Sequence, residues 1–274
     1  MILGVALIVA STLAYNASVI LLALAARRSG GGRFSPAISA GKRSSGVAGI
    51  ALDVAGWVLE AASLTLIPLT LARIVSAAGL GFLLLLSNLA LKEPLGRARL
   101  AGAGLLIAGL ASAGISPPSY GSATPGGREW AILVVSAGVV AGIPYVLRGG
   151  WIPHRPLLFA VSSGTSYALS GILTKGLIDL LPRHPAGSVL LLAALTAASA
   201  AAFDAQIRAL REMEASIAAP VILALHTVLP VAAAPPLFGE SWPSGTAPRI
   251  LLAAGILLTI IGAIIISASS RKAP

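Results

Sequence analysis

Residues 57–95 read WVLEAASLTLIPLTLARIVSAAGLGFLLLLSNLALKEPL, and this stretch decides the fold class. Two apolar runs meet here at Pro68. Each run is about as long as a helix that crosses a lipid bilayer, which takes about 20 residues. The tight joint at Pro68 leaves one re-entrant hairpin as an alternative to two complete spans. Charged residues lie within both runs, and charge inside a bilayer is costly, so each needs a reason.

The same kind of apolar run recurs along the whole chain of 274 residues, of which 57% are hydrophobic and only 10% charged. A soluble domain carries far more charge on its surface. We therefore expect an all-α, polytopic membrane bundle of about nine transmembrane helices. The predicted spans are residues 2–26, 46–67, 69–91, 98–115, 129–147, 157–181, 187–208, 215–237 and 248–268.

The basic residues, which give a formal net charge of +10, are distributed unevenly between the predicted links. With the N-terminus outside, the inside links hold 14 of the 19 Lys and Arg residues and the outside edge holds 4. Cytoplasmic links are enriched in Lys and Arg. This predicts a multi-pass cell-membrane protein with its C-terminus in the cytoplasm. We expect no nucleic-acid partner, because basic residues do not alternate with stacking aromatic residues.

An internal repeat is visible at an offset of roughly 150 residues. LKEPLGRARLAGAG, which contains Glu93 and ends at Gly104, resembles FGESWPSGTAPRILLAAG, which contains Glu240 and ends at Gly255. Tyr15-x-x-Ser18 likewise resembles Tyr167-x-x-Ser170, and Glu60 is matched to Asp204. An odd number of crossings separates equivalent points, so the two halves would be inverted, as in many secondary transporters. The alternative is a likeness of apolar composition alone.

The repeat predicts three parts. Residues 1–115 form a first repeat of four spans, residues 116–156 a linker with the fifth span, and residues 157–274 a second repeat of four spans.

The Glu, polar turn and Gly-containing helix that end each half resemble the EamA-type signature of the drug/metabolite transporter superfamily. The stretch 57–95 is similar to the corresponding part of the nine-span NIPA-type magnesium transporters. The resemblance implies a transporter fold and a small solute or Mg²⁺ as substrate. NIPA-type proteins tend to carry Asn at the position of Glu60 and a second Pro at that of Ile74, so the match to the magnesium branch is incomplete.

Charged residues inside the spans mark a candidate pathway. Glu60 and Arg73 lie at similar depth across the Pro68 turn and could form a buried ion pair, either structural or a gate. Asp53 is seven residues before Glu60 and shares its helix face, which suits a proton or a cation. Lys175 can pair with Asp179 four residues later, and the pair could be structural or functional.

Polar groups near the middle of other spans extend this list. His226 lies between Pro220 and Pro230, and prolines free backbone carbonyls, so we expect a broken helix here. The histidine could line a substrate site or bond to a neighbouring helix. Asn16 is central in the first span, and it could either line the pathway or form a structural hydrogen bond to a neighbouring helix. Asp204 and Arg208 form a second i,i+4 pair that we interpret as structural.

The sequence thus predicts a secondary transporter or exporter of a small metabolite, working by alternating access between inverted halves. Its predicted pathway residues are Asn16, Asp53, Glu60, Arg73, Lys175 and His226. A NIPA-like Mg²⁺ or divalent-cation transporter is the alternative, and a structural subunit or intramembrane enzyme is a third hypothesis. Because no P-loop, HExxH or strand-flanked GxSxG motif occurs, we expect neither ATP-driven transport nor an enzyme. We expect no cofactor, and a homodimer is left open.

The small residues Gly104, Ala108, Gly255 and Gly262 recur in steps along the fourth and ninth spans. We expect them to allow close helix packing.

Overall fold

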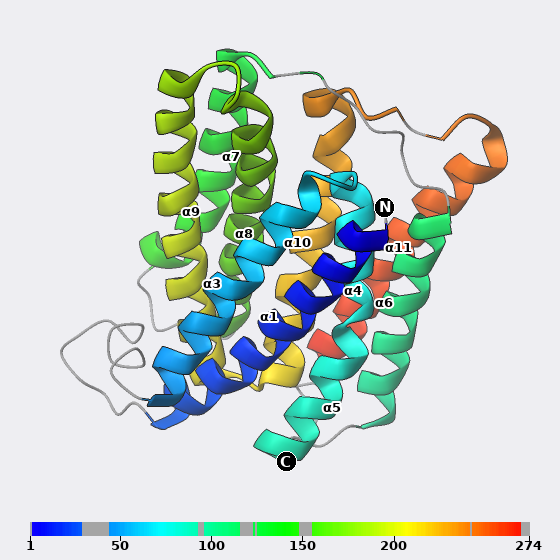
Figure 1. Cartoon of the computed structure of the whole chain (residues 1–274). Helices are drawn as coiled ribbons and strands as arrows, with labels where there is room; N and C mark the ends of the chain where they lie inside the picture. Colours follow the sequence, from blue (N-terminus) through cyan, green and yellow to red (C-terminus); the bar gives the residue numbers. More distant parts are fainter. Residues whose placement is uncertain are drawn as a thin grey trace.

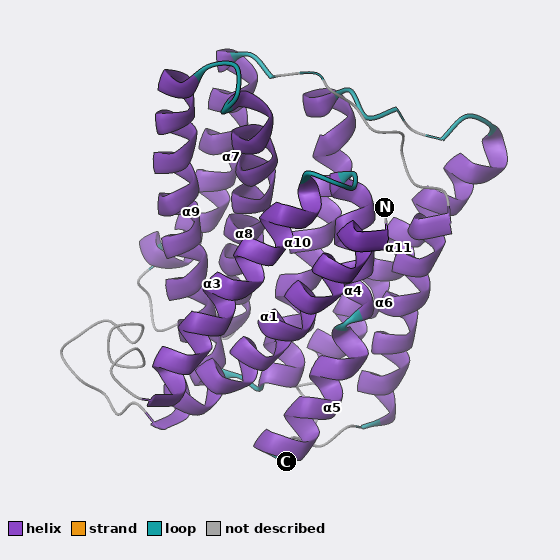
Figure 2. Ribbon diagram, viewed as in Figure 1, coloured by secondary structure: helices purple, strands orange, loops and turns teal. Residues whose placement is uncertain are grey.

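The computed structural model describes residues 2–28, 44–92, 96–115, 123, 125–147, 155–241 and 243–269. Within these ranges every regular element is an α-helix, as Figures 1 and 2 show. The helices are α1 (Ile2–Arg28), α3 (Ser44–Leu64), α4 (Leu69–Ala78), α5 (Leu80–Leu91), α6 (Arg97–Ile115), α7 (Gly127–Val146), α8 (Arg155–Leu180), α9 (Pro185–Glu212), α10 (Ala215–Phe238) and α11 (Thr246–Ser269).

Seven of the described helices are long and apolar enough to cross a membrane: α1, α3, α7, α8, α9, α10 and α11. The side chains on the outside of these helices explain why the helices suit a membrane. The exposed large side chains include Val54, Val135, Leu190 and Ile264, which belong to four different helices. Apolar side chains facing outward along the middle of helices are stable in hydrocarbon and unfavourable in water. The protein is therefore a helical, multi-pass membrane bundle.

The predicted span 69–91 is divided in two at Gly79, between α4 and α5. The Gly79 amide donates to the Ser76 carbonyl, a bond that spans three residues instead of four. A Cβ at this position would overlap the Thr12 methyl group and lie 2.8 Å from the Asn16 amide nitrogen. The break therefore occurs where α1 crosses so closely that only a glycine fits.

The break expected in span eight is absent, and that prediction was wrong. Helix α10 runs without interruption from Ala215 to Phe238 through Pro220, Pro230, Pro235 and Pro236. A proline's fixed φ is compatible with helical backbone, so each ring removes one hydrogen bond and crowds the carbonyl four residues earlier, which can bend a helix without ending it. Helix α10 also packs along α8, which supports its successive turns.

The helices pack in a few extensive pairs. Helix α1 lies along α3, α8 along α9, and α6 along α11, while α7 lies at the periphery against α8. In the α6–α11 pair, a Cβ at Gly109 would lie 2.5 Å from the Gly255 carbonyl oxygen, and one at Gly262 would lie 2.5 Å from the Gly102 carbonyl oxygen. Gly104 is exposed with nothing within 4 Å of its Cβ position, so the expected close packing does not occur there.

Two buried apolar clusters close the bundle at opposite ends. The first gathers residues near the C-terminal ends of α1 and α9 and the N-terminal ends of α8 and α10, including Leu22, Phe159 and Leu210. The second gathers Leu64 and Leu69 from the α3–α4 turn with Phe238 from the end of α10. Between these two layers several polar side chains from different helices come together, and this region holds the candidate site.

Candidate substrate-binding site

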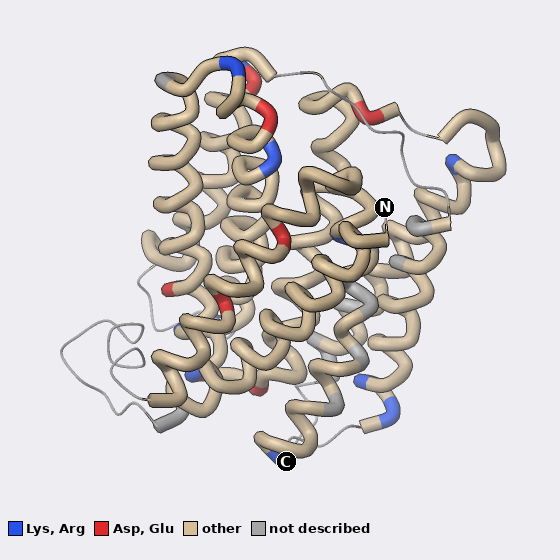
Figure 3. Tube along the Cα trace, viewed as in Figure 1, with Lys and Arg blue, Asp and Glu red and all other residues tan. Residues whose placement is uncertain are grey.

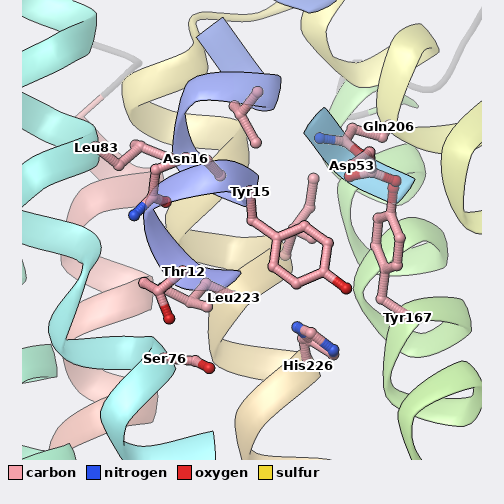
Figure 4. Close-up of a pocket in the computed structure, with 13 residues that line it drawn as sticks. Thr12, Tyr15, Asn16, Asp53, Ser76, Leu83, Tyr167, Gln206, Leu223 and His226 are labelled. Carbon is pink, nitrogen blue, oxygen red and sulfur yellow. The ribbon is translucent and has the colours of Figure 1, made fainter. Parts of the chain in front are cut away.

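A cavity of about 70 Å³ lies in the middle of the bundle, and thirteen residues line it (Figure 4). They come from α1, α3, α4 and α5 on one side and from α8, α9 and α10 on the other. The polar or aromatic members are Thr12, Tyr15, Asn16, Asp53, Ser76, Tyr167, Gln206 and His226. Figure 4 places Asp53, Gln206 and Tyr167 together on one side of the cavity and Thr12, Asn16 and Ser76 on the other.

A chain of four polar side chains from four helices lies beside this cavity, and its two end members, Tyr15 and His226, line it. The Tyr15 hydroxyl donates to Glu60 Oε2 at 3.0 Å, and Glu60 Oε1 lies 2.6 Å from Arg73 Nη2. Arg73 Nη1 in turn donates to His226 Nε2 at 2.6 Å, because a guanidinium can only donate. The Glu60 and Arg73 side chains are 4% and 1% exposed. The ion pair predicted across the Pro68 turn is thus present and fully enclosed.

Arg73 fits its place because of a glycine on α8. A Cβ at Gly171 would overlap the Arg73 guanidinium. Helix α8 therefore provides a notch for the arginine, and the contact joins α4 to α8 and α10. A buried guanidinium needs such a fitted, paired environment, because an unpaired charge at this depth would be strongly unfavourable.

The second half of the chain contains a contact similar to that of Tyr15. The Tyr167 hydroxyl donates to Gln206 Oε1 at 2.6 Å, between α8 and α9, just as Tyr15 joins α1 to α3. The sequence comparison matched Glu60 to Asp204, but the residue that holds the second tyrosine is Gln206. Asp204 instead accepts from Tyr145 at 2.9 Å and from Arg208 at 2.6 Å, which agrees with its structural interpretation.

Asp53 lines the cavity without an ion-pair partner among the described residues. The Ser18 hydroxyl of α1 is buried near this carboxylate and makes no hydrogen bond of ordinary geometry. Asp53 and Glu60 share a face of α3, as expected. They differ in environment, because Glu60 is neutralised by Arg73 and Asp53 is open to the cavity.

A second, larger cavity of about 470 Å³ adjoins the first. The two share four lining residues, Tyr15, Asp53, Tyr167 and His226. The larger cavity lies between α3 and α9, and its wall includes Val54 and Leu192, whose side chains are 54% and 48% exposed. Val54 lies at the middle of α3 and Leu192 in the first third of α9, both within candidate membrane spans, so this cavity opens sideways at membrane depth.

Two of the predicted pathway residues, Arg73 and Lys175, line neither cavity, whereas Asn16 lines the first. Asn16 lines the first cavity and donates through Nδ2 to the Gly79 carbonyl at 3.0 Å, so it holds the broken helix to α1. Lys175 is 0% exposed and bonds to Asp179 at 2.9 Å, but it lines neither cavity. The Lys175–Asp179 pair predicted from the i,i+4 spacing is present.

Glu240, a repeat-motif residue, lies just beyond the end of α10 and is 2% exposed. The Thr70 hydroxyl donates to its Oε2 at 2.7 Å, a contact that links the start of α4 to the end of α10. Burial raises the pKa of Glu240 above its usual value, and the Thr70 bond opposes this. The matching residue of the first half, Glu93, lies outside the described residues.

The sequence did not single out Tyr15, Tyr167 and Gln206 as site residues, although both tyrosines belong to the repeated pattern. Tyrosines at equivalent places in two repeats could have been a signal for residues facing a shared interior. Gln206 carries no charge, so the search for costly intramembrane charge passed over it.

The cavity contains oxygen and nitrogen groups, but among the described residues no three His, Asp or Glu side chains come together as metal ligands. No family model, curated protein or solved structure matches the chain. The function must therefore be argued from the geometry of the site.

Proposed function

We propose that this protein is a secondary transporter of a small solute, with nine spans arranged as two inverted four-helix repeats around a linker helix. One observation carries the proposal. A cavity lined by polar and apolar residues of both halves lies between two apolar layers that close opposite ends of the bundle. A solute held there is shielded from both sides of the membrane, as alternating access requires.

The helix pairing supports the inverted repeat. The pair α1–α3 of the first half corresponds to α8–α9 of the second, and each pair is joined by a tyrosine bond. Helices α4 and α5 then correspond to α10, and α6 to α11. Under this correspondence the extensive α6–α11 contact joins equivalent helices, as expected near a pseudo-two-fold axis.

The nine-span count takes α4 with α5 as one interrupted crossing and α6 as another. Interrupted helices near the midplane are common at transporter sites, because protein or water there can satisfy the freed backbone groups. At Gly79 the carbonyl accepts from Leu83 N and also from Asn16 Nδ2, so the interruption is joined to α1 inside the cavity region. The distribution of basic residues supports an outside N-terminus and a cytoplasmic C-terminus.

A Mg²⁺ or other divalent-cation pathway has less support. It would use Asp53 and Glu60 together, with waters, as carboxylate ligands. Glu60 instead bonds to Arg73 and Tyr15, and a carboxylate held in this way is a poor ligand for a second cation. The resemblance to EamA-type and NIPA-type transporters supports transport as the function, but it does not identify the solute.

Flux into proteoliposomes tests the proposal. The solute panel is Mg²⁺, a mixture of amino acids, a mixture of nucleobases, and benzyltrimethylammonium as an organic cation. We expect saturable uptake of one class, reduced at least tenfold by Asp53→Asn. The matched control is Glu129→Gln, which neutralises an exposed acid on α7 and should leave uptake unchanged. If no solute enters faster than into protein-free liposomes, the transport proposal fails.

A further inference from the structure

The charge inside the two cavities limits what can bind. Among their lining residues the acidic or basic ones are Asp53, Glu60 and His226. Glu60 is balanced by Arg73 at 2.6 Å. His226 Nε2 accepts from the same arginine, so the neutral imidazole is the form that fits this bond. Asp53 is thus the acidic lining residue without an ion-pair partner among the described residues, and when it is ionised a single positive charge would offset it in this region of low dielectric.

The aromatic residues of the cavities also favour a cationic ligand. Tyr15 and Tyr167 line both cavities together with Asp53. Their hydroxyls are already bonded to Glu60 and Gln206, so the rings are the surfaces that they offer to a ligand. Figure 4 shows the Tyr15 ring in the centre of the cavity, between the α10 and α8 side chains. A cation held beside a carboxylate and close to aromatic rings gains both ion-pair and cation–π stabilisation.

The larger cavity sets the shape of the ligand. Its volume of about 470 Å³ accommodates a group larger than a methylammonium ion. Beyond the shared residues its wall is mainly apolar, with Ile50, Val54, Leu192, Leu195 and Phe203. Because Val54 and Leu192 face outward within the membrane spans of α3 and α9, an apolar group can reach this cavity from the hydrocarbon side.

We propose that the site binds an organic monocation, a protonated or quaternary amine carrying an apolar body. The ammonium group lies at Asp53 between the two tyrosines, and the body occupies the cavity between α3 and α9. This inference rests on the proposed transport function for its physiological meaning, but the binding site itself can be tested without transport.

The test is equilibrium binding to the full chain reconstituted in lipid nanodiscs, with radiolabelled benzyltrimethylammonium as the probe. Unlabelled tetramethylammonium, phenylacetate and Mg²⁺ are the competitors. Benzyltrimethylammonium should bind saturably and tetramethylammonium at least tenfold more weakly, because it lacks the apolar body. Phenylacetate and Mg²⁺ should not compete. These comparisons use the unaltered protein, so they do not depend on whether a variant folds.

Two variants locate the ligand. Asp53→Asn should weaken binding of benzyltrimethylammonium at least tenfold, with Glu129→Gln as the control for removing an acid elsewhere. Val54→Trp, which fills the opening between α3 and α9, should weaken benzyltrimethylammonium and leave tetramethylammonium unchanged. Competition by phenylacetate or Mg²⁺, absence of saturable binding, or full affinity in a folded Asp53→Asn variant would overturn the inference.

Binding and flux separate this inference from the proposed function. If the protein binds the cation but transports no solute of the panel, the site assignment stands and the transport proposal fails. If it transports another class and does not bind benzyltrimethylammonium, transport stands and the substrate class is wrong.

Discussion

At the scale of single residues, the protein resolves the cost of buried charge by pairing. Glu60, Arg73 and His226 come from α3, α4 and α10, and two contacts of 2.6 Å connect them. Removing one member of a buried pair leaves the other charged and without a partner, which costs more than the pair contributes. Asp53 differs because its charge is left open to the cavity, and that difference distinguishes a structural carboxylate from a candidate binding carboxylate.

The pair predicts a non-additive effect on stability. Glu60→Gln alone should lower the free energy of unfolding by about 3 kcal/mol, because Arg73 stays charged in a buried notch. Adding Arg73→Met should recover part of this loss. Chemical unfolding in detergent, with all three variants, measures the coupling. Asp204→Asn is the control, since it acts on a half-exposed i,i+4 pair and should cost less than about 1 kcal/mol. Additive losses would show that Glu60 and Arg73 are not coupled.

At the scale of helices, glycines decide where elements bend and where they touch. The interruption at Gly79 and the close approach of α6 to α11 both occur where a Cβ would meet a neighbouring helix. In lipid there is little hydrophobic force between helices, so close contact of backbones through small residues supplies much of the association.

The α6–α11 contact gives a prediction with a matched control on the same helix. Gly109→Leu would force a side chain against the Gly255 carbonyl and Thr259, and should lower the free energy of unfolding by about 2 kcal/mol. Gly104→Leu adds the same side chain at an exposed position with nothing within 4 Å, and should change stability by less than about 0.5 kcal/mol. Thermal unfolding in one detergent compares the two. Equal destabilisation would mean that the contact with Gly255 does not decide the outcome, because helix propensity alone favours Leu over Gly at both positions.

At the scale of the whole molecule, charge and topology together define sidedness. Figure 3 shows acidic and basic residues mostly near the ends of the helices, with few in the middle of the bundle. Under the proposed inverted repeat, equivalent points of the two halves would lie on opposite faces of the membrane. Gly96, before α6, and Ser244, before α11, are such points, and both are exposed.

Cysteine labelling tests this arrangement, because the chain has no cysteine of its own. In intact cells a membrane-impermeant maleimide should label Ser244→Cys and should label Gly96→Cys only after the cells are broken. Denatured protein labelled at both positions is the control for reactivity. Labelling of both positions, or of neither, in intact cells would contradict the inverted repeat, and the reverse result would contradict the orientation alone.

The sequence by itself determined the features that depend on local order. Apolar runs of bilayer length predicted the helices, and spacing of four residues predicted the Lys175–Asp179 and Asp204–Arg208 contacts. Both follow because neighbours along a helix are neighbours in space. The Glu60–Arg73 pair was also predictable, since the tight turn at Pro68 keeps the two residues at one depth.

Only the tertiary structure decided which distant groups meet. Tyr167 with Gln206, Arg73 with His226, and Asn16 with the Gly79 carbonyl join helices whose rotation the sequence pattern left open, because these helices are apolar on most faces. For the same reason the position of the helix break was misjudged. Proline chemistry is local and pointed to α10, whereas the break at Gly79 depends on how closely α1 passes, which is a property of packing.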